Sequence, residues 1–119
     1  MWSPDGTVIV YAGADVGALS PVLAASPDGI RVELPAITVR RDGERIRFLP
    51  GGKGLVYMQG DGMSQDFWIL DMASKQARQL TRFTGNATMR TFDITSDGRQ
   101  IVFDRLRENS DIVVIDIPK

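Results

Sequence analysis

The sequence of 119 residues contains no cysteine and no histidine. The lack of cysteine excludes disulfide bonds, thiol catalysis and zinc–thiolate sites. The lack of histidine removes the commonest general base, the commonest transition-metal ligand and any triad that depends on an imidazole. These chemistries are thus closed to the chain, and we predict that it has no catalytic residue, no cofactor-binding residue and no metal ligand.

Long apolar runs and an excess of one charge are also missing. No apolar run approaches the ~18 residues of a membrane span, and residues 1–10 lack the basic and then apolar segments of a signal peptide. We interpret Met1 as a start introduced by truncation or cloning. The 14 basic and 15 acidic side chains nearly cancel, so we expect neither nucleic acid nor a membrane surface as a direct partner.

Three stretches of the chain resemble one another at an interval of 46 residues. The tetrapeptides SPDG, LPGG and TSDG begin at Ser3, Leu49 and Thr95, and a short apolar segment follows each of them. A further apolar segment recurs at an interval of 45, as PVLAAS from Pro21, DFWILD from Asp66 and DIVVID from Asp111. Such self-similarity indicates a repeat architecture of about two and a half copies.

Each repeat has the composition of a β-sheet. The apolar segments are short and rich in β-branched and aromatic residues, and Asp-Gly or Gly-Gly pairs typical of tight hairpins lie between them. We predict four antiparallel strands per repeat, in the middle one roughly residues 44–49, 54–58, 66–71 and 77–81. The stretch 74–83, SKQARQLTRF, could form a helical turn, but its place in the repeat favours a strand.

The central strands are apolar on both faces, which is typical of sheets covered on both sides. We therefore predict an all-β fold, a β-propeller fragment of about three incomplete four-stranded blades. Blade one comprises residues 1–37 and lacks most of its inner strand. Blade two comprises 38–84, and blade three comprises 85–119 and lacks its outer strand.

An open propeller piece leaves apolar sheet faces and strand edges without partners. The missing blades of a longer propeller could cover them. Copies of the chain could also associate, two of them making a six-bladed ring, and we expect such a homo-oligomer. A monomeric open half-ring is the remaining alternative.

Several stretches carry a family resemblance: SPDG followed by IVY, then DFWILDMASKQARQLT at 66–81, then FDITSDGRQIVFDRLRENSDIVVIDIP at 92–118. They resemble the TolB-type, WD-repeat-like propeller repeat of bacterial proteins over nearly the whole chain. The last stretch is similar to the end of the propeller in some bacterial Ser/Thr protein kinases. The first copy departs from the pattern, because PVLAASPDG replaces the aromatic segment.

The resemblance implies a non-catalytic module for protein interaction or sensing in a larger cell-envelope protein, in a periplasmic or other extracytoplasmic location. Two alternatives stay open: the C-terminal regulatory propeller of a membrane Ser/Thr kinase, and the gating propeller of a prolyl-oligopeptidase-like serine peptidase. The partner implied is a protein or the missing blades.

Acidic residues recur near strand ends, at Asp66 and Asp111 and at Asp71 and Asp116. Because they recur once per repeat, we predict that they cap turns and do not form a metal or acid–base site. The stretch 61–66, DGMSQD, only loosely resembles a calcium loop, and Ser64 within it has no histidine to activate it.

The residues 31–47 hold five arginines, which are Arg31, Arg40, Arg41, Arg45 and Arg47. Interleaved acids and the lack of alternating aromatics favour a solvated connection between blades over a phosphate or nucleic-acid site, with a protein-contact surface second. The charged stretch 105–111 is predicted to be a solvated loop at one rim. Four aromatic residues are predicted to pack between blades because their repeat equivalents are all apolar: Phe67, Trp68, Phe92 and Phe103.

Overall fold

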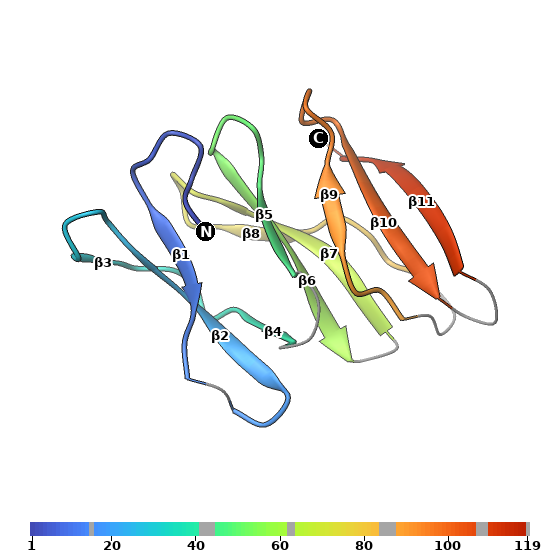
Figure 1. The fold of residues 1–119 in the computed structure, drawn as a ribbon, viewed down its shortest axis with the longest axis horizontal. Helices are drawn as coiled ribbons and strands as arrows, with labels where there is room; N and C mark the ends of the chain where they lie inside the picture. Colours follow the sequence, from blue (N-terminus) through green and yellow to red (C-terminus); the bar gives the residue numbers. More distant parts are fainter. Residues whose placement is uncertain (15, 41–44, 62–63, 84–87, 107–109, 119) are drawn as a thin grey trace.

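The computed structural model describes residues 1–14, 16–40, 45–61, 64–83, 88–106 and 110–118. These residues form strands and turns only, in three separate antiparallel sheets (Figure 1). Sheet 1 contains β1 (Ile9–Ala12), β2 (Leu19–Ala25), β3 (Arg31–Val32) and β4 (Thr38–Arg40). Sheet 2 contains β5 (Ile46–Phe48), β6 (Gly54–Asp61), β7 (Ser64–Asp71) and β8 (Ala77–Gln79). Sheet 3 contains β9 (Phe92–Ile94), β10 (Gln100–Leu106) and β11 (Ser110–Asp116).

Sheet 2 is the complete unit, with its four strands paired in chain order β5-β6-β7-β8. The register of β6 and β7 places Tyr57 opposite Trp68 and Val56 opposite Ile69. The stretch 74–83 contributes β8, which pairs with β7. The prediction of a strand there is confirmed. Pairing with β7 outweighs the local helical tendency of Lys, Gln, Ala and Arg.

The outermost strand of sheet 1 is divided into two short pieces, β3 and β4. β3 and β4 both pair with the same edge of β2, and Pro35 lies between them. Proline has no N–H to donate to a ladder, so one continuous strand cannot form there. The predicted boundary assigns residues 38–40 to blade two. In the structure these residues form β4, which pairs with β2 of sheet 1. Before β1, Trp2 forms a bridge with Ile9, and the backbone of Met1 exchanges two hydrogen bonds of 2.8 Å with that of Val10.

Sheet 3 is the shortest unit. Its strands pair in the order β11-β10-β9, and β11 has no second neighbour among the described residues. The described part of sheet 3 thus contains three strands, and the lack of an outer strand in blade three stays a prediction. Within the described part of the chain, one edge of β11 therefore has backbone N–H and C=O groups without a strand partner.

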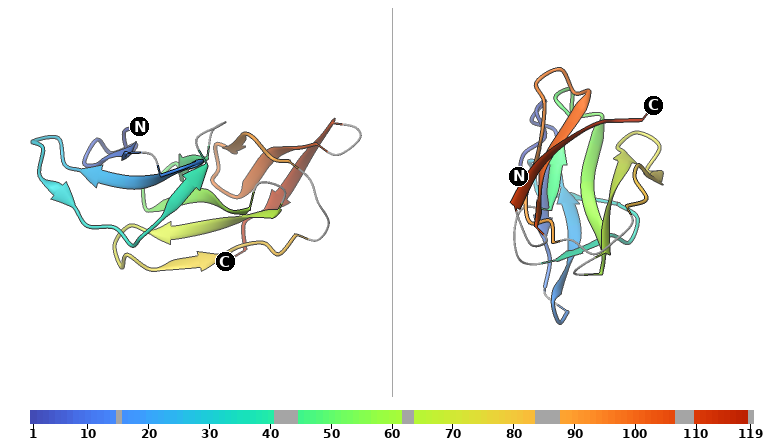
Figure 2. Two further views of the ribbon diagram at one scale, coloured as in Figure 1. Left: turned by 90° about the horizontal axis from the view of Figure 1, so that it is seen from below. Right: turned by 90° about the vertical axis from the view of Figure 1, so that its right-hand side faces the viewer.

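The three sheets stand side by side as blades, in a flat body with extents of 46 × 35 × 19 Å (Figures 1 and 2). Two apolar clusters hold them together. The first joins sheets 1 and 2 and includes Val10, Val22, Leu55 and Tyr57. The second joins sheets 2 and 3 and includes Phe67, Phe92, Ile101 and Phe103. The core is thus divided between two inter-sheet layers, and the prediction of a propeller fragment of three blades is confirmed.

The turn between β9 and β10 shows why the SPDG-like motif recurs. The hydroxyl of Thr95 donates to the carboxylate of Asp97 at 2.6 Å, and the N–H of Arg99 donates to the same oxygen at 3.0 Å. These two bonds hold the pKa of Asp97 below its ordinary value. Gly98 follows with φ of 73°, a conformation that side chains disfavour. The same hydroxyl-to-carboxylate bond occurs in two other turns, from Ser3 to Asp5 and from Ser26 to Asp28.

Candidate interaction surfaces

Each sheet has two apolar faces because successive side chains of a strand point to opposite sides. We call the face that carries Val10, Val56 or Val102 the leading face, and the face that carries Ile9, Leu55 or Ile101 the trailing face. The three residues in each set are repeat equivalents, 46 positions apart.

Inside the molecule a leading face always packs on the trailing face of the next sheet. In the first cluster Val10 and Val22 of sheet 1 meet Leu55 and Tyr57 of sheet 2. In the second cluster Val56, Met58 and Phe67 of sheet 2 meet Ile101 and Phe103 of sheet 3. The same kind of contact is therefore made twice, with different side chains.

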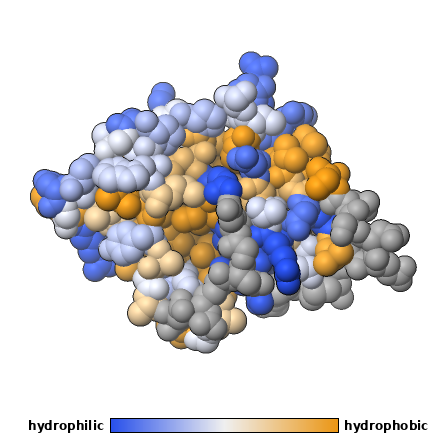
Figure 3. Space-filling view, viewed as in Figure 1, coloured by the Kyte–Doolittle hydropathy of each residue, from blue (hydrophilic) through white to orange (hydrophobic). Residues whose placement is uncertain are grey.

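The leading face of sheet 3 has no such neighbour among the residues that the structure describes. Ile112 and Val114 of β11 are 75% and 52% exposed, and Leu106 of β10 is exposed beside them. The register places Val114 opposite Val102 and Ile112 opposite Asp104. Figure 3 shows apolar surface over β10 and β11, on the right of the view. This face is the repeat equivalent of the buried leading face of sheet 2.

The trailing face of sheet 1 is open in the same way. The register places Tyr11 opposite Leu23 and Trp2 opposite Ile9, so these side chains share this face. Trp2 is 56% exposed and Tyr11 is 44% exposed, whereas the equivalent Tyr57 of sheet 2 is buried. Exposed aromatic and aliphatic side chains gathered on one face make it a candidate interaction surface.

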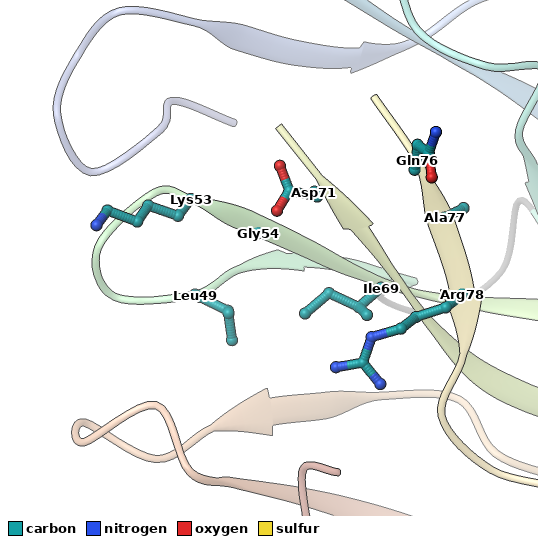
Figure 4. A pocket seen from close by; sticks show the side chains of 8 residues that line it. All are labelled: Leu49, Lys53, Gly54, Ile69, Asp71, Gln76, Ala77 and Arg78. Carbon is teal, nitrogen blue, oxygen red and sulfur yellow. The ribbon is translucent and has the colours of Figure 1, made fainter. Parts of the chain in front are cut away.

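A groove of about 370 Å³ lies where the outer part of sheet 2 meets sheet 3 (Figure 4). Leu49 and Ile69 form its apolar part. Arg78 donates to the carbonyl of Pro118 at 2.7 Å. Asp71 accepts two bonds at 2.9 Å from backbone N–H groups of the turn after β7, which lower its pKa. These polar groups are engaged by the chain itself, so we assign the groove to the junction of two sheets.

The structure places the recurrent aspartates at turns and strand ends. Asp71 caps the turn after β7, as predicted. Asp66 accepts bonds at 2.8 Å from the hydroxyl of Thr81 and the N–H of Phe83, and Asp116 accepts one at 3.0 Å from the amide of Gln100. The side chain of Asp111 lies outside the described residues. Within the described ranges, no group of three or more acidic side chains comes together as a metal site would require.

Arg45 differs from the prediction of a solvated connection. Its side chain is buried, and its guanidinium donates to the amide oxygen of Gln65 at 2.8 Å and to the carbonyl of Met89. It thus links sheet 2 to the chain that leads into sheet 3. Arg47 pairs with Asp93 of β9 at 3.7 Å, so both arginines join neighbouring units.

The other arginines are placed as follows. Arg31 is exposed and lies 3.6 Å from Glu33, and Arg40 ends β4. Arg41 lies outside the described residues, as do residues 62–63 of the DGMSQD stretch and residues 107–109 of the charged loop.

The aromatic residues pack between sheets, as predicted. The ring of Phe67 lies 5.1 Å from that of Phe92 and 5.0 Å from that of Phe103, both in edge-on arrangements. Trp68 stacks on Tyr57 at 6.5 Å, on the other side of sheet 2. These rings pack in the layers between neighbouring sheets.

Comparisons with known proteins agree with this architecture. No family model and no curated protein matches the sequence. Among solved structures, TolB from Acinetobacter baumannii has a TM-score of 0.68 at 19% identity over 97% of this chain. A putative TolB from Agrobacterium tumefaciens has a TM-score of 0.65 at 14% identity over 97%. The β-propeller domain of the Trilobed protease from Pyrococcus furiosus, described as having an open velcro topology, has a TM-score of 0.59 at 12% identity over 92%.

The chain is a partial β-propeller. It spans 28%, 43% and 35% of the three solved chains named above, which is less than half of each. Its predicted similarity to TolB-type propellers is confirmed by the structures of TolB proteins. The described residues include no helix that is long and apolar enough to cross a membrane.

Proposed function

We propose that this chain acts as a non-catalytic interaction or sensing module within a larger cell-envelope protein. The observation that supports this role is the pair of open apolar faces, the leading face of sheet 3 and the trailing face of sheet 1. Exposed aromatic and aliphatic residues that share one face are typical of protein-binding surfaces. The free edge of β11 adds backbone groups that an extended segment can pair with.

The location is proposed on the likeness to TolB proteins. Fractionation of cells that produce the natural full-length protein tests it. Recovery with the periplasmic or envelope fraction supports the proposal, and recovery with cytoplasmic markers contradicts it.

Site-specific photo-crosslinking in the same cells tests the interaction role. A photoreactive phenylalanine replaces Ile112 on one face, Tyr11 on the other, and Ser96 in an exposed turn as the control. We expect crosslinks to defined protein segments, identified by mass spectrometry, from the first two positions and not from Ser96. A folded protein that gives no crosslink from either face would contradict the proposal.

A second candidate is the gating propeller of a serine peptidase. Its support is the likeness to the Pyrococcus horikoshii acylaminoacyl peptidase, with a TM-score of 0.61 at 15% identity over 92% of this chain, and to the Trilobed protease propeller. A G-x-S-x-G segment in the same gene, with hydrolysis of a peptide ester by the full-length protein, would favour this role. Absence of hydrolysis by that protein would count against it.

A further inference from the structure

The two open faces belong to opposite sides of the repeat. Sheet 3 exposes a leading face, whereas sheet 1 exposes a trailing face. Both apolar clusters between sheets join one face of each kind. The chain therefore carries, at its two ends, the two halves of a contact that it already makes twice internally.

The exposed residues of the two open faces are repeat equivalents of residues that are buried between sheets. Ile112 stands 45 residues after Phe67, and Val102 stands 46 residues after Val56. Phe67 and Val56 are fully buried against the trailing face of the next sheet. On the other open face Tyr11 is equivalent to Tyr57, which is buried against the leading face of sheet 1.

We propose that two copies of this chain associate head to tail, the leading face of sheet 3 of each packing on the trailing face of sheet 1 of the other. This inference rests on the proposed interaction role and names a second copy as the partner. The three described sheets of each copy would make a closed ring of six, within the range of about four to eight blades for propellers. Three copies would make nine and exceed that range. The contact is heterologous, and closure prevents growth into filaments.

Several charged groups lie on these faces, namely Asp93, Asp104 and Asp116 on sheet 3 and Arg31 on sheet 1, and the carboxylate at the centre of the sheet 3 face already has partners. Asp104 lies on the leading face of sheet 3, opposite Ile112. Its carboxylate accepts the backbone N–H of Arg90 at 3.0 Å and that of Thr91 at 3.1 Å. Because its charge is held by two donors of its own sheet, covering this face does not leave it without hydrogen bonds.

Light scattering during size exclusion, over about 1–100 µM protein, measures the association. We expect a particle of twice the 13.1 kDa chain mass. Ile112→Glu and Tyr11→Glu each place a carboxylate in one half of the contact, and each should weaken it about 100-fold. Ser96→Glu makes the same change in charge in an exposed turn and should leave the mass unchanged. Circular dichroism checks that all three variants remain folded.

Mixing the two face variants separates a heterologous from an isologous contact. A dimer of Ile112→Glu with Tyr11→Glu has one interface with both carboxylates and one interface with wild-type residues on both sides. We expect the mixture to regain dimers that neither variant forms alone. A mixture that stays monomeric while wild type dimerises would overturn the head-to-tail arrangement.

If the wild-type protein has the mass of one chain at every concentration, the proposal that a second copy is the partner is wrong. The photo-crosslinking experiment described above shows whether the interaction role fails as well. Crosslinks from Ile112 or Tyr11 to another protein would then keep the interaction role, and their absence would remove both.

Discussion

Truncating Phe67 to alanine is expected to lower the free energy of unfolding by about 3–5 kcal/mol. Its side chain is fully buried, and its ring contacts those of Phe92 and Phe103 at 5.1 and 5.0 Å. The loss combines the apolar area returned to water with the cavity left between sheets 2 and 3. Small domains are stable by only about 5–15 kcal/mol, so the variant should lose a large share of its stability.

Urea unfolding, followed by the fluorescence of the neighbouring Trp68, measures this loss. If the alanine variant does not fold, Phe67→Leu keeps most of the volume and removes the ring contacts, for an expected loss of about 1–3 kcal/mol.

The matched control is Ile112→Ala at the equivalent position of the next repeat. Ile112 is 75% exposed, so its truncation should change stability by no more than about 0.5 kcal/mol at concentrations where the chain is monomeric. Equal losses for Phe67→Ala and Ile112→Ala would refute the reasoning, because they would show that packing of sheet 2 on sheet 3 adds nothing at this position.

Three further changes test the turns and the buried arginine. The hydroxyl of Thr95 and the N–H of Arg99 lower the pKa of Asp97, so its carboxylate stabilises the fold above its unfolded pKa of about 3.9 and this contribution is lost as the pH falls. Asp97→Asn should flatten the acid-side loss in urea titrations between about pH 5 and pH 2, and an unchanged slope would contradict this. Gly98→Ala should cost about 1–2 kcal/mol because its φ is 73°, whereas Gly51→Ala, with open space around its Cβ, should cost far less in the same thermal or urea assay. Arg45→Met leaves the carbonyl of Met89 and the amide oxygen of Gln65 without that donor, for an expected loss of about 1–3 kcal/mol, and a neutral result in urea would show that water replaces the guanidinium.

The strands, the hairpin turns and the propeller class could all be predicted from the residues alone. These follow from local rules: β-branched segments, Asp-Gly turns and apolar residues on both faces of a strand all act over a few neighbours. The interval of 46 residues then extended the assignment to weak segments such as 77–81, which became β8. The aromatic residues could be assigned to the core in the same way, since their repeat equivalents are apolar.

Which of these features lie in contact depends on the packing of the whole chain. Arg45 is buried because its guanidinium reaches the carbonyl of Met89, 44 residues later in the chain, and no local pattern encodes such a contact. The same holds for the division of the fourth position of sheet 1 into β3 and β4, which both bond to β2. Equivalent residues also acquire different environments: Phe67 is buried and Ile112 is exposed, because burial depends on whether another sheet stands in front of the face and not on the residue itself.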